Sequence, residues 1–503
     1  MSKKHLFTRR IGAIILCAAV MLSVLCGGMT TVNAEEAKSS VPKIKVVTDG
    51  GNGTSLEKAD GYVPAKITIS DSDGYELSDK VNFKVRGNTT ALSWVKKKAY
   101  TFKFEKKKDV LGMGKGKKWA LIANTFDPTL LRSYIAFNTA QELEIPFTSN
   151  QKYAEVWVDE TYVGCYILYE PTQAGKDRVD IDIDGNDGKK DFLIEYELSR
   201  EEEDVTYFKA DGLRFISSEP EEPTEEQLSY ITSTMTDIFK TMKNGTQEEI
   251  AQKVDLSSFV KFYLLNEYIK TFDFSMSSVF FYYKDGILYA GPPWDYDLSA
   301  GNSNSGLSDR CTRAADPTGV YANSNIYRYL YNKDWFKTLV RDEYEKHYTY
   351  FKNIHADGGL MDTLLNDYGD LFNRNYTDAG WNVSKWWINI SKKPLPTYQE
   401  NFDYLKDWYS QRSSWFETYF KPFSREYKIG DANGDGKVDI NDVTLIQKYL
   451  AMLDVKVDDY FIYRANVTHD DLTVVDATEI QRFLSHFPNR YGIDNSAVAT
   501  LPH

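Results

Sequence analysis

A run of oxygen-bearing side chains near the C-terminal end constrains the fold of this chain more than any other feature. In residues 431–442, acidic and amide residues occupy loop positions 1, 3, 5, 9 and 12, and Gly436 stands at position 6, where such a loop turns sharply. A hard dication such as Ca²⁺ requires six to eight oxygen ligands at about 2.3–2.6 Å. Lys437, at position 7, would contribute its backbone carbonyl. The expected calcium ligands are Asp431, Asn433, Asp435, Lys437, Asp439 and Asp442.

The helix expected after this loop is repeated 34 residues further along the chain. A second loop precedes the repeat, but Asp471 replaces the glycine and the run is one residue shorter, which should weaken calcium binding. Two such units predict a small all-α module with paired EF-hand-like loops. The ligands expected in the second loop are Asn466, Thr468, Asp470 and Asp476.

The paired units resemble a dockerin over residues 428–487. The resemblance implies a Ca²⁺-dependent module at residues 428–488 that docks a secreted enzyme onto the cohesin domain of a scaffoldin, followed by a flexible tail at 489–503. In dockerins, loop positions 10 and 11 and the helix beyond them largely choose the partner. These positions hold Ile-Asn in one unit and Val-Val in the other, so the two faces are not expected to be equivalent. Carried over, the partner-binding residues are Ile440, Asn441, Gln447, Lys448, Val474, Val475, Gln481 and Arg482.

Residues 1–34 are typical of a secretory signal peptide, with a basic start, an apolar stretch at 11–26 and small residues at 32–34. A membrane anchor is the alternative, but the apolar stretch is shorter than the ~20 residues that a span needs. A lipid anchor at Cys26 is disfavoured by the bulky Leu25 before it. We therefore expect an exported, extracellular chain that is free of the membrane after cleavage and attached to a cellulosome. The leader's basic residues are Lys3, Lys4, Arg9 and Arg10, and without these four the formal charge of −13 becomes −17.

Between the leader and the C-terminal module, residues 35–425 predict a large α+β domain. The 42% hydrophobic and 14% aromatic content argues against disorder, and the negative net charge argues against a general nucleic-acid binder. Short alternating runs indicate strands in the early part, whereas later patterns are mostly helical. We expect helices to begin at Asp127 and after the capping box at 224–227. Cleavage of the leader leaves Cys165 and Cys311, either as one disulfide or as two free thiols.

Several short motifs recur in a fixed order in the large domain. Each one alone is weak, but the ordered set resembles the spore-coat CotH kinase family from residues 42–302, with weaker helical similarity to about residue 420. The resemblance implies an atypical kinase-like fold, use of Mg²⁺ and ATP, and phosphorylation of protein Ser or Thr. The motifs lie at residues 85–90, 97–100, 111–115, 118–124, 127–132, 162–170 and 293–298.

Phosphoryl transfer needs carboxylates on Mg²⁺, cations on the phosphate oxygens and a carboxylate near the accepting hydroxyl. The resemblance implies that Asp295 holds Mg²⁺ and that Asp273 is the second catalytic or metal carboxylate. Asp297 lies two residues after Asp295, so an extended backbone aims both the same way, as a ligand or as a support. A capped turn is the alternative for this pair. The candidates for binding the nucleotide are Arg86, Lys98 and Lys103, with Glu155 or Glu170 as ion-pair partners.

One departure from the family pattern leaves alternatives open. Family members carry Asn before the aromatic strand that precedes Trp294, but residues 278–283 contain no amide. This favours, as a second hypothesis, a weakly active or inactive structural component of a polysaccharide-degrading complex. Aromatic faces suit sugars, and the candidate residues are Trp386, Trp387, Trp408 and Trp415. A glycoside hydrolase is a third hypothesis, which needs two carboxylates ~5–9.5 Å apart.

Overall fold

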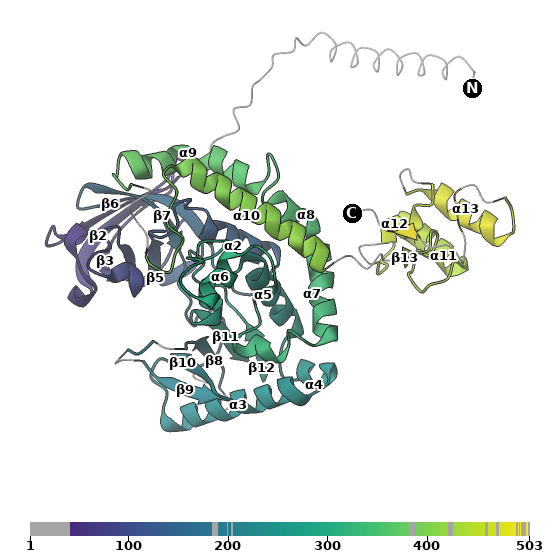
Figure 1. The fold of residues 1–503 in the computed structure, drawn as a ribbon, viewed down its shortest axis with the longest axis horizontal. Helices are drawn as coiled ribbons and strands as arrows, with labels where there is room; N and C mark the ends of the chain where they lie inside the picture. Colours follow the sequence, from purple (N-terminus) through teal and green to yellow (C-terminus); the bar gives the residue numbers. More distant parts are fainter. Residues whose placement is uncertain are drawn as a thin grey trace, which may run out of the picture. The chain divides into compact units, whose positions relative to one another are not determined.

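The computed structural model describes residues 41–183, 190–198, 200–202, 205–382, 388–420, 426–457, 461–468, 472–488, 491, 493, 499 and 500 (Figure 1). The expected leader, residues 1–34, lies outside this description. Among the helices of the described residues, none combines the length and the apolar character that a membrane crossing requires.

The first part of the described chain forms a closed barrel with the strand order β1-β2-β3-β4-β5-β7-β6. β1 pairs with β6 in parallel, and the other neighbouring strands pair antiparallel. Successive side chains of a strand point to opposite faces, so Ile67, Phe83 and Trp119 are buried in the barrel core whereas Lys66 and Lys103 are exposed. The strands are β1 (Lys43–Thr48), β2 (Val63–Ser70), β3 (Glu76–Arg86), β4 (Ala99–Asp109), β5 (Lys115–Ile122), β6 (Gln151–Val158) and β7 (Thr161–Tyr169).

A second, antiparallel sheet follows, in the order β12-β11-β8-β10-β9. Its central strand β8 places Phe192, Ile194 and Tyr196 in a core shared with the helices. The alternate residues Leu193 and Glu195 therefore lie on the opposite face of the sheet. The strands are β8 (Phe192–Tyr196), β9 (Tyr207–Ala210), β10 (Leu213–Glu219), β11 (Val279–Lys284) and β12 (Ile287–Ala290).

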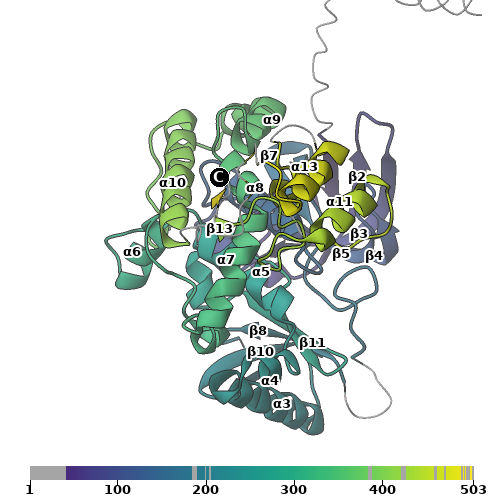
Figure 2. The ribbon, with the colours of Figure 1, turned by 90° about the vertical axis from the view of Figure 1, so that its right-hand side faces the viewer.

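Helices cover the first of these faces, and α3 lies along β9 and β10 (Figures 1 and 2). The ring of Phe239 in α3 stacks on Phe215 at 5.9 Å, and the ring of Phe259 in α5 stacks on Phe281 at the same distance. The helices of the large domain are α2 (Arg132–Glu142), α3 (Glu225–Asn244), α4 (Gln247–Ala251), α5 (Leu256–Ile269), α6 (Asp309–Ala315), α7 (Asp334–Lys346), α8 (Tyr348–Asn353), α9 (Leu360–Thr377) and α10 (Tyr398–Tyr419).

Late helices also contact the early barrel, because α9 packs against β7. The Asn375 side-chain oxygen accepts a hydrogen bond from the Cys165 backbone N–H at 3.0 Å, and the Trp381 indole donates to the Val163 carbonyl at 2.8 Å. Gly164 between them has φ +103°, and a Cβ there would lie 2.5 Å from the Asn375 oxygen. This close approach requires glycine. The barrel and the helical part are thus joined through α9.

The mixed α+β prediction is confirmed, with strands early and helices late. Thr224 is the N-cap of α3, and its side chain and that of Gln227 form the expected capping box. The predicted helix start at Asp127 is wrong, since α2 begins at Arg132. Leu130 adopts φ +63°, which interrupts a right-handed helix there. Both remaining cysteines are buried free thiols.

The C-terminal residues form their own small apolar cluster around Ile446 and Ile480, the latter on the repeated helix. Ile493 is buried in the same cluster, and Ala499–Thr500 pair with Glu426–Tyr427, so this unit includes residues beyond 488. Its elements are β13 (Glu426–Tyr427), α11 (Ile440–Leu450), α12 (Phe461–Ala465), α13 (Val474–Leu484) and β14 (Ala499–Thr500).

Candidate active site

Three carboxylates predicted from the sequence come together at one site. Asp273 lies in η4 (Phe272–Ser275), the short turn after α5, and Asp295 and Asp297 lie in the segment after β12. Burial, together with the charges of Asp295 and Asp297, raises the pKa of Asp273 well above its usual value. The three carboxylates from the two segments therefore lie near enough to influence one another electrostatically, and Asp295 and Asp297 line one cavity.

Asp295 keeps access to solvent, although protein atoms surround it densely. Burial raises its pKa, and the nearby Arg86 and Arg200 guanidinium groups act in the opposite direction. The backbone of Asp295 has φ +62°, a strained conformation for a non-glycine residue. The nearby Ser278 side chain also acts to lower the pKa of Asp295. The position at which the family pattern predicts an amide thus presents a hydroxyl to the site.

Asp297 is half-buried beside Asp295. Burial raises its pKa well above the usual value, and the charges of Asp295 and Asp127 add to this effect. The Leu298 backbone N–H and the Arg132 guanidinium partly offset the rise. Asp297 is therefore the carboxylate that connects the site to the turn before α2.

Arg86, at the end of β3, supplies a cation to the site. Its guanidinium lies 5.0 Å from the centre of the Trp294 ring, and the neighbouring Asp295 favours its charged form against the effect of burial. Trp294 in turn packs against Tyr169 at the end of β7, with 5.1 Å between ring centres. The predicted role of Arg86 near the carboxylates therefore agrees with its position.

Arg200 is a residue that sequence reasoning missed. Its guanidinium forms ion pairs with Glu195 at 3.2 Å, Glu197 at 3.5 Å and Glu202 at 3.1 Å. Burial works against its charge, yet the three carboxylates together raise its pKa. Burial also raises the pKa of Glu195 to about 7. The available signal was the alternation of Glu195 and Glu197 in an otherwise apolar strand, because a charge in such a strand needs a partner.

Two cavities lie at the end of β7, and one of them is lined by Asp295 and Asp297. A small one of about 40 Å³ is bounded by Asp295, Asp297 and Trp294 together with residues of the barrel and α2. A larger one of about 320 Å³ lies beyond Tyr169, between the β4–β5 turn and the segment after β7. The larger cavity is lined by Gly112, Met113, Gly114, Phe147, Thr148, Ser149, Asn150, Glu170, Pro171, Thr172, Gln173, Asp177, Arg178, Val179 and Pro292.

Comparison with known families decides the relationship of this chain. The family model described as CotH kinase protein matches residues 83–416, which include all three carboxylates, Arg86 and Arg200. The chain belongs to the CotH kinase protein family. No curated protein matches it. Residues 428–493, which contain the loop–helix repeat, lie outside the matched range.

The structure of this CotH family member does not bring the other nucleotide candidates to the carboxylates. The Lys98 ammonium is buried against Glu57 at 3.0 Å, and it also donates to backbone carbonyls beside η3 (Thr89–Ala91). Lys103 alternates to the exposed side of β4. Glu155 forms an ion pair with Arg374 of α9. Lys98 and Glu155 therefore hold the barrel and its contact with α9, whereas Lys103 is exposed.

Glu170, the alternative partner, lines the larger cavity. It forms an ion pair with Arg178 and accepts a hydrogen bond from the Asn150 backbone N–H at 2.9 Å. Burial raises its pKa, and Arg178 acts in the opposite direction. The Arg178 guanidinium also lies 4.8 Å from the centre of the Trp119 ring. Glu170 therefore positions the cavity wall, on the far side of Tyr169 from the three aspartates.

The donor set at the aspartates fits a hard dication. Among the described residues, no three His, Cys, Asp or Glu side chains already stand close enough together to hold a metal ion. The carboxylates of Asp273, Asp295 and Asp297 repel one another, however, and a cation would relieve that repulsion. Oxygen ligands of this kind suit Mg²⁺. Ser278 adds a hydroxyl oxygen beside Asp295.

The first predicted calcium loop closes on itself through hydrogen bonds. The Asp431 carboxylate accepts from the Asp435 N–H at 3.1 Å and from the Gly436 N–H at 2.8 Å. The Asp442 carboxylate accepts from the Asn433 N–H at 3.0 Å and from the Asp439 N–H at 2.8 Å. Burial raises the pKa of Asp442 to about 6. The buried carboxylates of Asp431 and Asp442 thus accept hydrogen bonds from the backbone of their own loop, whereas Asp435 and Lys437 are exposed. Calcium binding by this loop stays a prediction.

The second loop has a similar arrangement around its last acidic residue, Asp476. The Asp476 carboxylate accepts from the Thr468 N–H at 3.0 Å and hydroxyl at 2.8 Å, and from the Thr473 N–H at 2.8 Å. Asp470 lies outside the described residues, whereas Asn466 and Thr468 lie within them.

The residues predicted to bind a partner gather on the surface of α11 and α13. Apolar side chains at the starts of the two helices are exposed: Ile440 by 57%, Val474 by 65% and Val475 by 49%. Asn441, Gln447, Lys448 and Gln481 are exposed, and Arg482 is half-buried. Exposed apolar residues thus stand at the start of both helices, and their role in binding a partner stays a prediction.

Proposed function

We propose that this chain is a Mg²⁺- and ATP-dependent phosphotransferase that acts on Ser or Thr hydroxyls of proteins. The observation that carries the proposal is the convergence of Asp273, Asp295 and Asp297, from two segments, beside the guanidinium groups of Arg86 and Arg200. Carboxylates for the metal and cations for phosphate are what phosphoryl transfer requires. Membership of the CotH kinase protein family supports the same reaction.

In the proposed reaction, Asp273 accepts the proton of the attacking hydroxyl. The hydroxyl oxygen forms a bond to the γ-phosphorus of ATP. The bond between the γ-phosphorus and the oxygen that bridges it to the β-phosphate breaks, and ADP leaves with the bridging oxygen. The raised pKa of Asp273 makes it a stronger base than an ordinary aspartate. Asp295 and Asp297 would hold Mg²⁺, and the metal would neutralise charge on the phosphate oxygens.

The remaining groups bind the nucleotide in this proposal. Arg86 donates to phosphate oxygens, since its guanidinium already faces Asp295 and is held against Trp294. The cavity of about 320 Å³ beyond Tyr169 is large enough for a base, because ligand cavities begin at about 300 Å³. Ser278 takes the position of the expected amide and offers a hydroxyl oxygen, which serves as a Mg²⁺ ligand in other phosphoryl-transfer enzymes.

We further propose that the chain is secreted and tethered to a cohesin-bearing scaffold by a Ca²⁺-dependent dockerin at residues 428–488. The inward-facing carboxylates of the first loop and the exposed residues Ile440, Val474 and Val475 support this role. Removal of Ca²⁺ should abolish scaffold binding, because the binding energy of the metal contributes to folding of such a module. Scaffold binding that persists in a chelator would contradict the tether.

A non-catalytic, carbohydrate-binding role is the second candidate, and the described tryptophans do not favour it. Trp408 is buried, and its indole donates to the Ala315 carbonyl at 2.9 Å. Trp415 is half-buried and stacks on Tyr419, with 4.5 Å between ring centres. Trp386 and Trp387 lie outside the described residues. The two described residues stabilise α10 and do not present a flat face to a sugar.

Transfer of labelled phosphate tests the kinase proposal. The full chain would be incubated with Mg²⁺, γ-labelled ATP and extracellular proteins as acceptors, and phosphoserine and phosphothreonine would be measured. We expect transfer by the wild type and its loss in Asp273→Ala and Asp295→Ala. Lys103→Ala is the matched control, because Lys103 lies on the exposed side of the barrel. Absence of transfer by the wild type to every acceptor, itself included, would overturn the proposal.

A further inference from the structure

The loop that carries two of the three aspartates, residues 295–302, is held in a strained shape. Asp295 has φ +62° and Ala300 has φ +43°, both in the left-handed region that non-glycine residues rarely adopt. Such conformations persist only where the surrounding contacts fix them. The contacts that hold this loop therefore decide where the carboxylates of Asp295 and Asp297 lie.

One set of contacts joins the loop to the segment of Asp273. The Ala300 N–H donates to the Ile269 carbonyl at the end of α5 at 2.7 Å, and the Phe272 N–H donates to the Leu298 carbonyl at 2.9 Å. On the Asp273 side, both backbone hydrogen bonds are made by residues that come just before Asp273 in the sequence, Ile269 and Phe272. The two segments that carry the aspartates are thus joined directly to each other.

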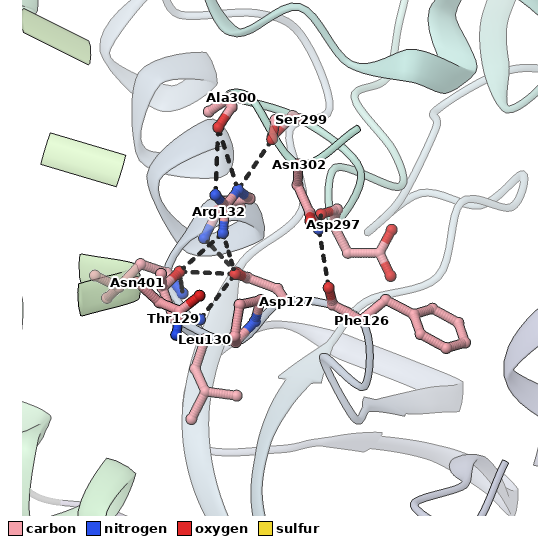
Figure 3. A network of polar contacts seen from close by, with 12 residues as sticks. Phe126, Asp127, Thr129, Leu130, Arg132, Asp297, Ser299, Ala300, Asn302 and Asn401 are labelled. Atoms are coloured by element: carbon pink, nitrogen blue, oxygen red, sulfur yellow. Dashed lines mark hydrogen bonds and ion pairs between the residues drawn. The ribbon is translucent and has the colours of Figure 1, made fainter. Parts of the chain in front are cut away.

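Arg132, at the start of α2, holds the loop from the opposite side (Figure 3). Its Nε donates to the Ser299 carbonyl at 3.0 Å, and its Nη2 donates to the Ala300 carbonyl at 3.4 Å. Its Nη1 forms an ion pair with the Asp127 carboxylate at 2.5 Å, and both side chains are at most 2% exposed. A buried guanidinium with a carboxylate on one edge and two carbonyls on the other has little freedom to move.

Asn302 completes the network with a single amide group (Figure 3). Its Nδ2 donates to the Asp297 carbonyl at 2.7 Å and to the Phe126 carbonyl at 2.9 Å. Asn302 is 2% exposed, so water does not compete for these hydrogen bonds. The amide links the backbone of Asp297 directly to the residue that precedes Asp127.

The turn at residues 127–130 is itself held by the last helices of the large domain. The Tyr376 hydroxyl of α9 donates to the Pro128 carbonyl at 2.9 Å, and the Tyr398 hydroxyl of α10 donates to the Thr129 carbonyl at 3.2 Å. A continuous set of contacts thus runs from α9 and α10, through the turn and Arg132, to the aspartates. This gives a physical reason for the family match to extend to residue 416, far past the chemistry.

We propose that Arg132 and Asn302 are positioning residues that hold Asp295 and Asp297 where a divalent cation binds. The inference rests on the proposed phosphotransferase function, because that function assigns the cation to these aspartates. Arg132 and Asn302 set the cation affinity and kcat while leaving the nucleotide KM nearly unchanged, since neither side chain faces the larger cavity. Loss of partners that orient metal ligands in proteins costs about 10–100-fold in metal affinity or activity.

The test compares Asn302→Ala with Asn401→Ala. Asn401 is a matched control, because it is also buried and its amide also donates to two backbone carbonyls, those of Leu395 and Thr397. It lies in α10 beside the same network (Figure 3), so the comparison asks whether direct donation to the Asp297 backbone matters, as opposed to any loss of a buried amide nearby. Mn²⁺ binding to the full chain without nucleotide is measured by electron paramagnetic resonance, and kcat and KM for ATP are measured with Mg²⁺. We expect Asn302→Ala to weaken Mn²⁺ binding and lower kcat by about 10–100-fold, with KM changed less than threefold, and Asn401→Ala to change neither.

Arg132→Lys is the second variant, because it retains the ion pair with Asp127 but loses the two-pronged donation to Ser299 and Ala300. Hydrogen exchange of residues 296–302 supplies a readout that needs no catalysis. Faster exchange of these residues in Asn302→Ala and Arg132→Lys, but not in Asn401→Ala, supports the positioning role. Absence of phosphate transfer by the wild type would contradict the kinase proposal, but it would not remove this support for positioning. Equal exchange and equal Mn²⁺ affinity in Asn302→Ala and Asn401→Ala would overturn the inference.

Discussion

The carboxylates around Asp295 and those of the first loop around Asp431 gather negative charge in different ways. In the loop, all acidic groups lie within residues 431–442, and backbone N–H groups of the same run neutralise them at 2.8–3.1 Å. At the candidate active site, the carboxylates come from two segments, and their charge is balanced by guanidinium groups from other parts of the sequence. The loop is a local structure, whereas the active site exists only when the whole domain is folded.

The two regions therefore differ in what a bound metal ion would contribute to them. If the first loop binds Ca²⁺ as we propose, the metal would contribute mainly to folding of that module. If the aspartates bind Mg²⁺ as we propose, the metal would contribute to chemistry rather than to folding, because other contacts already hold the surrounding domain together. Removing the two metals, or their ligands, should therefore give opposite patterns of damage.

The largest expected effect separates catalysis from docking. Asp295→Asn should lower phosphate transfer by roughly 10²–10³-fold, because the cation that neutralises the phosphate charge is lost. Asp442→Asn, a matched change in the calcium loop, should leave transfer unchanged and abolish scaffold binding. Initial rates with γ-labelled ATP and a cohesin pull-down measure the two properties. Equal loss of transfer in both variants would contradict the separation.

Calcium removal should unfold one region and spare the other. In the full chain treated with a calcium-selective chelator, α11 and α13 should exchange their amide hydrogens nearly as fast as an unfolded chain, because the loops supply their N-terminal anchors. α2 and α5 should keep their protection, since the cores of the large domain hold them. Hydrogen exchange followed by mass spectrometry measures both regions at once. Protection of α11 that survives the chelator would show that the loop needs no metal to fold.

Nucleotide binding should depend on Arg86 and not on Lys98. Arg86→Ala should weaken ATP binding by about 10–100-fold, the value of one charge-assisted hydrogen bond to phosphate. Lys98→Ala should leave the ATP affinity unchanged and lower the melting temperature, because Lys98 ties η3 to Glu57. Isothermal titration calorimetry and thermal unfolding make the comparison. Weaker ATP binding in Lys98→Ala alone would restore the sequence-based assignment of that residue.

The smallest effect concerns the two calcium loops. Thr468→Asp should tighten calcium binding at the second loop by up to about tenfold, since it adds a carboxylate where the loop has a hydroxyl. Asn433→Thr, which gives the first loop the residue that the second loop has at the matched position, should weaken calcium binding at the first loop. Calorimetric titration with calcium resolves the two steps. An unchanged second step in Thr468→Asp would indicate that the missing residue and glycine, rather than ligand charge, limit this loop.

The same contrast governs how much the sequence could predict. The spacing of residues 431–442 predicted a turn-rich loop, and the Asp431 and Asp442 carboxylates do accept hydrogen bonds from backbone N–H groups of that run. Binding of calcium there stays a prediction. Asp273 and Asp295 required a resemblance to a family, since 22 positions separate them in the sequence and only the fold brings them together. Residue types did predict the mixed α+β class, because strand and helix periods differ.

Charge alone was a poor guide to the cations. Lys98 and Lys103 belong to a lysine-rich segment, yet one is buried against Glu57 and the other faces outward from β4. Arg200 was missed because its partners Glu195 and Glu197 look like surface residues until β8 proves to be the centre of a sheet. The sequence predicted a helix start at Asp127, because the left-handed backbone conformation of Leu130 cannot be recognised from the residue type.

Binding of ATP to the full chain, measured by calorimetry with and without Mg²⁺, tests the central proposal most directly. We predict binding that requires Mg²⁺ in the wild type and that is lost in Asp295→Asn, with both proteins showing the same melting temperature within a few degrees in the absence of ligand. ATP binding that is equally tight without Mg²⁺ or in Asp295→Asn, or no binding at all by the wild type, would contradict the assignment of these aspartates to a metal–nucleotide site.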